Sequence, residues 1–166
     1  LKRVPPRAMR PAGHGARAGA SAAGGVPFHR WLATLKFLSG WDDQRRFARG
    51  ELEEWFAGYL RKEGVFPEQD LCRVVVSMML SVRRVDVAVV KHFKACSVRG
   101  ELLQECTIAQ VNILRVVAHE LLEAARGAPR VFTADLGALA QVVQHLRFGR
   151  AFGELLRLLV ASLRRA

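Results

Sequence analysis

A helical spacing of apolar side chains runs almost without interruption from residue 28 to residue 163, and it constrains the fold more than any other feature. Apolar residues recur at i, i+3, i+4 and i+7, which places them along one side of an α-helix and leaves polar residues on the other. No stretch shows the sustained alternation that a strand requires. The pattern therefore predicts an all-α body.

Glycine, proline and helix-capping residues divide this pattern into separate helices. The clearest beginning is at Thr107, because Thr107 and Gln110 can form a capping box. We expect Asp86 and Thr133 to cap two further helices and Pro67 to be the first residue of another. Seven stripes cover about residues 28–38, 52–60, 67–82, 86–98, 107–125, 133–147 and 152–163. The sequence thus predicts an antiparallel helical array or short α-solenoid of about seven helices, with 107–125 and 133–147 in the core.

Residues 1–27 differ in composition from the helical domain, residues 28–166, and are predicted to form an extended tail. They are rich in Arg, Pro, Gly and Ala and lack acidic residues, so the segment should be disordered in isolation. We consider three explanations: a retained tail that binds a polyanion or large assembly, a leftover mitochondrial targeting region held only by protein, and the composition of a GC-rich genome. The cations at this end of the chain are Lys2, Arg3, Arg7, Arg10, Arg17 and Arg30.

The formal net charge is +11, and arginine outnumbers lysine by 21 to 5. The planar guanidinium group binds phosphate or carboxylate through two hydrogen bonds and can stack on bases, which favours a structured RNA partner. In the body, basic groups recur near predicted helix ends, where helix dipoles alone also favour cations. In an antiparallel array such ends gather on one edge, so we predict RNA contacts there. In the body, the predicted RNA contacts are Arg45, Arg46 and Arg49, then Arg83 and Arg84, then Arg147 and Arg150. A fourth pair, Arg164 and Arg165, also lies near a predicted helix end but is not assigned to RNA.

The sequence contains no recognisable reaction chemistry. His119 and Glu120 resemble part of a zinc-protease helix, but Glu123 stands where the second histidine is needed. His92 and Cys96 lie four residues apart on one predicted helix face and could share a metal, but Cys106 would have to supply the third ligand and no fourth is evident. The three cysteines, Cys72, Cys96 and Cys106, are expected to be buried as small hydrophobic residues in a reducing compartment. We predict no enzyme activity, no catalytic residue, no metal and no cofactor. No apolar run in the sequence is long enough to span a membrane, so we expect no membrane span.

A short pattern before two of the predicted helices repeats weakly. Phe66-Pro67 followed by Asp70-Leu71 is echoed by Phe132-Thr133 followed by Asp135-Leu136. Over about residues 65–105 and 131–165 the chain resembles the degenerate helical-repeat proteins of organelles, the octotricopeptide and heptatricopeptide type. This resemblance implies a role in organellar RNA metabolism or in an organellar ribosome.

These observations lead to two hypotheses. In the first, the chain is a structural, RNA-contacting component of a mitochondrial ribosome or related ribonucleoprotein, located in the matrix. Its helical body docks on the particle beside neighbouring proteins, and its basic tail contacts rRNA. In the alternative, it is an accessory subunit of a mitochondrial respiratory or ATP synthase complex and acts through protein–protein contacts only.

Overall fold

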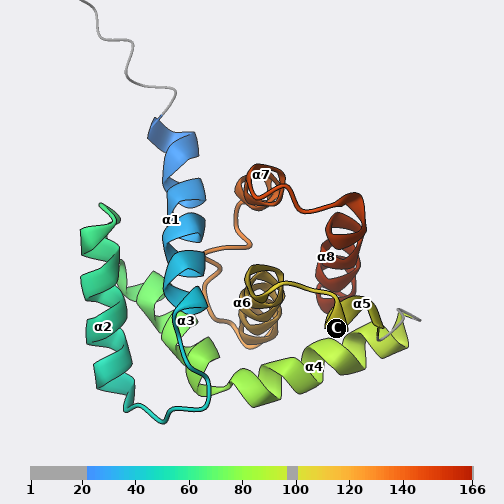
Figure 1. Cartoon of the computed structure of the whole chain (residues 1–166), viewed down its shortest axis with the longest axis horizontal. Helices are drawn as coiled ribbons and strands as arrows, with labels where there is room; N and C mark the ends of the chain where they lie inside the picture. Colours follow the sequence, from blue (N-terminus) through green and yellow to red (C-terminus); the bar gives the residue numbers. More distant parts are fainter. Residues whose placement is uncertain (1–21, 97–100, 166) are drawn as a thin grey trace, which may run out of the picture.

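The structure, a computed structural model, describes residues 22–96 and 101–165, and every regular element in these residues is a helix (Figure 1). The all-α prediction is confirmed. Apart from the single turn of α5, the described helices number seven, as the apolar pattern indicated. The elements are α1 (Ala22–Ser39), α2 (Arg49–Lys62), α3 (Gln69–Leu80), α4 (Val82–Ala95), α5 (Glu101–Gln104), α6 (Ile108–Ala124), α7 (Leu136–His145) and α8 (Arg150–Leu163).

The helices gather around α6, which packs against α1, α3, α4 and α8. Helices α1 and α2 lie side by side and antiparallel, and α4 crosses below α6 and α8 (Figure 1). Helix α7 packs on α1, so segments more than 90 residues apart in sequence are in contact. In a solenoid each unit touches only its sequence neighbours. The helical array found here is instead closed around one central helix.

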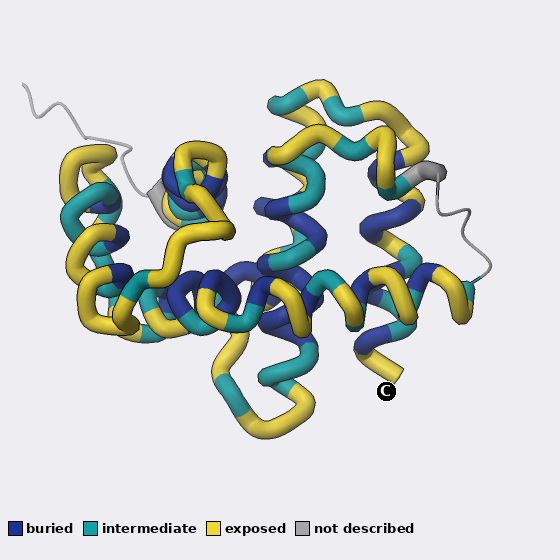
Figure 2. Tube along the Cα trace, turned by 60° about the horizontal axis from the view of Figure 1, so that its bottom comes forward, coloured by how far each residue is buried: buried dark blue, intermediate teal, exposed yellow. Residues whose placement is uncertain are grey.

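The central position of α6 follows from its composition. Between Asn112 and Leu121 every residue is buried except Arg115, which is half-buried, so the helix has almost no face suited to water. Figure 2 shows the buried residues concentrated toward the middle of the molecule. Each fully buried Leu, Val or Phe side chain contributes about 1.5–3 kcal/mol. The prediction that residues 107–125 lie in the core is confirmed, and Leu139 and Val142 of α7 are buried as well.

Several helix ends are as the sequence predicts. The Thr107 hydroxyl accepts from the Gln110 N–H at 3.3 Å, and the Gln110 side chain accepts from the Thr107 N–H at 2.8 Å, which completes the capping box. Gly64 and Gly127 follow α2 and α6 with positive φ angles of 73° and 92°. Only glycine adopts this left-handed conformation without steric cost, which explains why these helices stop there.

Three predicted helix starts are wrong. Asp86 lies inside α4, which begins at Val82, because the carboxylate pairs with Arg115 of α6 instead of capping. Thr133 does not cap α7; Asp135 does, accepting from the Ala138 N–H at 3.0 Å. Helix α3 begins at Gln69, two residues after Pro67.

Thr133 belongs to a buried network centred on Glu120, which is only 1% exposed. The Glu120 carboxylate accepts hydrogen bonds from the backbone N–H groups of Val131, Phe132 and Thr133 and from the Thr133 hydroxyl. The Phe132 and Thr133 N–H groups lie 2.8 and 3.1 Å from it, and the Thr133 hydroxyl lies 3.2 Å away. This network ties the segment between α6 and α7 to the central helix.

The helical body begins earlier than the predicted boundary at residue 28, because α1 starts at Ala22. The apolar stripe begins only at Phe28, so the preceding residues give no helical signal in the sequence. Phe28 is partly buried and packs edge-on against His145 of α7, with ring centroids 5.3 Å apart. Phe66 and Phe132, which carry the repeat resemblance, differ in environment: Phe66 is 76% exposed and Phe132 is 3% exposed.

Candidate nucleic-acid interface

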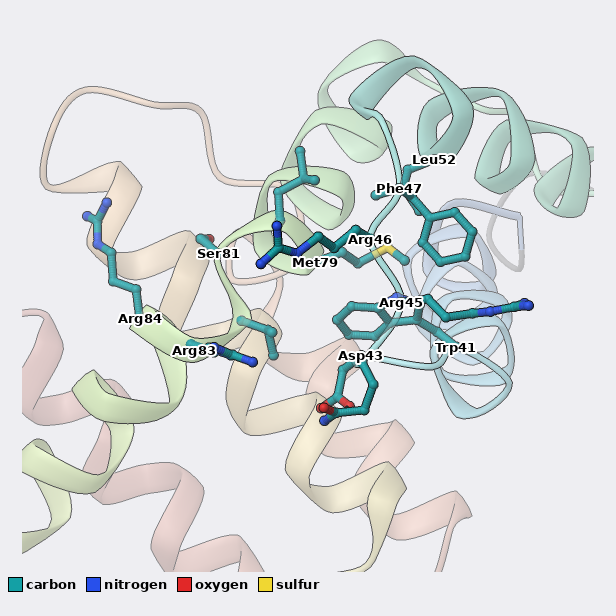
Figure 3. A pocket seen from close by; sticks show the side chains of 13 residues that line it. Trp41, Asp43, Arg45, Arg46, Phe47, Leu52, Met79, Ser81, Arg83 and Arg84 are labelled. Carbon is teal, nitrogen blue, oxygen red and sulfur yellow. The ribbon is translucent and has the colours of Figure 1, made fainter.

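Residues of two predicted basic groups line one pocket of about 620 Å³, which lies where α2 begins and α3 ends (Figure 3). One wall is the loop of residues 41–48 between α1 and α2, and the other is the junction of α3 and α4. Leu52, Met79 and Val82 are buried and form an apolar floor. The polar and aromatic lining residues are Trp41, Asp43, Gln44, Arg45, Arg46, Phe47, Ser81, Arg83 and Arg84. We call this the basic pocket.

Local interactions give the 41–48 loop its shape. Asp42 accepts from the Gln44 N–H through its side chain at 3.0 Å and from the Arg45 N–H through its carbonyl at 3.3 Å, which forms a tight turn. Phe47 packs on Trp55 of α2, with ring centroids 5.7 Å apart. This aromatic contact holds the end of the loop next to Arg45 and Arg46 against α2.

The second wall depends on the break between α3 and α4. Only Ser81 separates the two helices, and its hydroxyl bonds back to the Ser77 carbonyl at 2.7 Å. The chain therefore changes direction at one residue, which places Arg83 and Arg84 in the first turn of α4, where no acidic residue is present. Cations at a helix N-terminus oppose the helix dipole. Helix stability therefore does not explain these two arginines, although it was the alternative explanation for basic residues near helix ends.

Figure 3 shows how the arginines are arranged. The side chains of Arg46 and Arg83 reach toward the same opening from opposite walls, with the Trp41 indole beside them. Arg45 extends to the other side of Trp41, and Arg84 lies at the outer edge. Trp41 is half-buried and all four arginines are exposed. The opening thus combines two guanidinium groups and an aromatic face.

Few acidic groups offset this charge. Among the described residues that line the pocket, Asp43 is the only acid, and its Oδ2 lies 3.7 Å from Nη2 of Arg115. Arg115 also forms two bonds of 2.7 Å with Asp86, and these bonds raise its pKa above the ordinary value despite its burial. Arg84 lies 3.8 Å from Glu123. Arg45, Arg46 and Arg83 form no ion pair with any residue in the described ranges, so they can bind an external anion.

The other predicted RNA-contacting residues lie elsewhere. Arg30 pairs with Glu68, and Arg49, the first residue of α2, lies 3.8 Å from Glu53. Arg147 lies in the turn between α7 and α8, and Arg150 is the first residue of α8; both are on the opposite side of the molecule (Figure 1). Lys2, Arg3, Arg7, Arg10 and Arg17 lie outside the described residues. The structure therefore brings together Arg45, Arg46, Arg83 and Arg84 out of the predicted set.

The aromatic residues of the pocket were not among the predicted site residues. Trp41 and Phe47 flank Arg45 and Arg46 closely in sequence, and aromatic residues interleaved with arginines are a known composition of nucleic-acid-binding surfaces. Both aromatic residues lie between two apolar helix stripes, so the helical spacing gives no indication of their role. Chemically, the pocket can bind a phosphate between two guanidinium groups and present an indole face for stacking.

The other titratable groups show no comparable arrangement. Burial lowers the pKa of His119 and of His92 below their ordinary values, and burial raises the pKa of the Cys72 thiol. The cysteines, including Cys96 and Cys106, are half-buried and not fully buried as predicted. Within residues 22–96 and 101–165, no group of three or more His, Cys, Asp or Glu side chains is placed to hold a metal ion. No helix in the same ranges is long and apolar enough to cross a membrane.

Comparison of the chain with protein-family models, with curated proteins and with solved structures found no match.

Proposed function

We propose that this chain is a non-enzymatic, RNA-contacting structural component of a mitochondrial ribosome or related ribonucleoprotein in the matrix. The observation that carries the proposal is the basic pocket. There Arg46 and Arg83, which are 37 residues apart in sequence, reach one opening beside Trp41 and have no acidic partner among the described residues.

The pocket favours RNA over an acidic protein for a physical reason. An acidic peptide needs only the arginines, whereas a nucleotide uses the arginines for its phosphate and the Trp41 face for its base. Stacking on an aromatic side chain contributes about 1–3 kcal/mol per base and tolerates any base. Contacts of this kind position a protein on RNA without reading its sequence, as expected of a structural component.

The tail and the body have separate parts in this proposal. The acid-free N-terminal segment supplies five cations within residues 1–17, and the pocket supplies arginines on a rigid surface. The rich Arg and Ala content of the segment supports the mitochondrial location. Deleting residues 1–17 should flatten the salt dependence of RNA binding by up to about 3–5 in the log–log slope. The body should stay folded, because α1 begins only at Ala22.

The test is a binding measurement on the full chain with a labelled RNA hairpin. Arg46→Ala/Arg83→Ala should weaken binding about a hundredfold or more, since each of the two charge-assisted bonds to phosphate contributes about 1.5–3 kcal/mol. Arg61→Ala/Arg73→Ala is the matched control: it removes the same charge from exposed sites on α2 and α3 that do not line the pocket. Trp41→Ala should weaken binding of the RNA hairpin, which uses the indole face, but should not weaken binding of poly-glutamate, which uses only the arginines. Equal losses in both double variants would contradict the proposal.

One observation favours the alternative, an accessory subunit of a respiratory or ATP synthase complex. Large apolar side chains are exposed on the outer face of α4, where Val87 is 68% and Val90 is 41% exposed. Such residues are suited to a protein interface. If neither the unmodified protein nor the variants bind the RNA hairpin at physiological salt, the result would support this alternative.

A further inference from the structure

We propose that a groove between α7 and α8 binds an acidic amphipathic helix of a partner protein. The groove has a volume of about 780 Å³ and shares no lining residue with the basic pocket. It goes beyond the proposed function, because an RNA-binding component and an accessory subunit can each use it.

The groove exists because α7 and α8 pack on different neighbours. Helix α7 packs on α1, whereas α8 packs on α6 and α4, so the two helices diverge after the short turn that joins them. The turn is closed by two bonds of 3.1 Å, from the Phe148 N–H to the Val143 carbonyl and from the Arg147 N–H to the Gln144 carbonyl. Arg147 adopts a left-handed φ of 54° in it, the position that usually holds glycine. The groove is therefore held open by the fold itself.

The surface of the groove is apolar at its base. Leu139 and Val143 of α7 line one side of the groove, and Leu156 and Val160 of α8 line the other. Gly153, one turn before Leu156 on α8, also lines it. A Cβ atom placed on Gly153 would meet no atom within 4 Å, so this side of α8 borders open space. An α-helix with its side chains is about 10–12 Å wide and uses apolar residues at i, i+3, i+4 and i+7 to enter such a groove.

The charge along the groove identifies the occupant. Arg150, Arg157 and Arg164 line it at intervals of seven residues, two helical turns or about 10.5 Å each. Arg157 lies 2.9 Å from Glu154, which is the only acid among the described lining residues. Arg150 and Arg164 have no ion pair within the described part of the chain. A partner helix lying along α8 with Asp or Glu every seven residues would match all three.

This chain does not itself supply such a helix. Residues 1–27 contain no acidic residue, and no helix among the described residues carries two acidic residues seven positions apart. A second copy and the N-terminal segment therefore both lack the matching charges. The apolar base of the groove is unsuited to a phosphate backbone, which needs polar contacts along its length. The chemistry favours a separate, acidic helical protein.

The test uses a displayed library of helices about 18 residues long, which can span all three arginines at 1.5 Å per residue. Apolar residues are fixed at i, i+3, i+4 and i+7 and the other positions are random. Selection on the full chain should enrich Asp and Glu at seven-residue intervals. The Arg150→Gln/Arg157→Gln/Arg164→Gln variant should bind a selected peptide about tenfold more weakly at low salt.

Matched variants separate groove binding from other effects. Gly153→Phe should block the peptide and Gly153→Ala should not, because only phenylalanine fills the groove. Ala140→Glu, at an exposed lining position of α7, should repel the acidic peptide without disturbing the core. Arg46→Ala/Arg83→Ala should leave peptide binding unchanged, which distinguishes failure here from failure of the RNA proposal. Enrichment of neutral or basic helices, of no helix, or of helices that still bind Gly153→Phe and Ala140→Glu would overturn the inference, as would displacement by an RNA hairpin.

Discussion

Replacing Glu120 with glutamine tests whether a buried carboxylate holds the segment between α6 and α7. The change preserves the shape of the side chain and removes its charge. One carboxylate oxygen accepts from Val131, Phe132 and Thr133, and the other lies 2.8 Å from the Phe132 nitrogen. In Glu120→Gln a donor NH2 group replaces one of the two oxygens and faces a backbone N–H that is also a donor. A buried donor is therefore left without an acceptor, and the remaining bonds lose charge assistance.

The expected loss can be estimated from these contacts. Leaving a buried donor unsatisfied costs about 1–3 kcal/mol, and bonds to a charged group are about twice as strong as neutral ones. We expect Glu120→Gln to reduce the free energy of unfolding by about 2–3 kcal/mol and Glu120→Ala by about 3–5 kcal/mol. A domain of this size has a total stability of about 5–15 kcal/mol, so both changes are large.

Urea denaturation followed by circular dichroism measures this loss, and hydrogen exchange locates it. The amides of Val131, Phe132 and Thr133 should lose protection in Glu120→Gln before the core does. Glu123→Gln, on the same helix, is the control: its side chain is 33% exposed and pairs with Arg126, so the loss should stay below about 1 kcal/mol. If the free energy of unfolding of Glu120→Gln lies within about 0.5 kcal/mol of that of the unmodified protein, the network has no stabilising role.

Three further predictions concern the core, the pH dependence and the support of the basic pocket. Leu139→Ala, at a side chain 3% exposed, should cost about 2–5 kcal/mol in denaturant unfolding, whereas Leu80→Ala, 44% exposed, should cost less than 1 kcal/mol. Burial lowers the pKa of His119 and of His92, so the unfolded chain binds protons more readily than the folded one. The free energy of unfolding should therefore fall as pH drops below about 6.5. Urea titrations at several pH values measure this fall, and His119→Gln should make it smaller. Arg115→Ala removes the ion pairs with Asp86 and Asp43 and should reduce the free energy of unfolding by about 1–3 kcal/mol; the loss is limited because both carboxylates are partly exposed and screened by water. The same change should weaken RNA binding, because the 41–48 loop loses its ion pair with α6.

The helices could be predicted from the sequence because their signals are local. Apolar spacing identifies the buried side of each helix, and the bonds between Thr107 and Gln110 and the glycines after α2 and α6 are set by neighbours in the chain. Asp86 and Thr133 show where local signals fail. Both residue types cap helices well, but here Arg115 and Glu120, 29 and 13 residues away, bind them instead. No short stretch of sequence contains that information.

The candidate site was predictable only as separate pieces. The basic groups at Arg45 and Arg83 were recognised, but their meeting depends on two changes of chain direction, at the 41–48 loop and at Ser81. The apolar pattern did not separate α3 from α4 at Ser81, so Arg83 and Arg84 were expected near a helix end and not in the first turn of α4. The groove between α7 and α8 was not predicted, because it depends on which neighbours each helix packs against.

The salt dependence of RNA binding tests the central claim most directly, because its slope counts phosphate contacts. For the full chain and a labelled hairpin, log K is measured against log salt in the unmodified protein, in Arg46→Ala/Arg83→Ala and in the control Arg61→Ala/Arg73→Ala. If the pocket holds phosphate through both arginines, the first double variant should flatten the slope by about 1.4–1.8, at 0.7–0.9 per contact, and the control should not change it. Equal slopes in all three proteins would contradict the assignment of the basic pocket as an RNA-binding site.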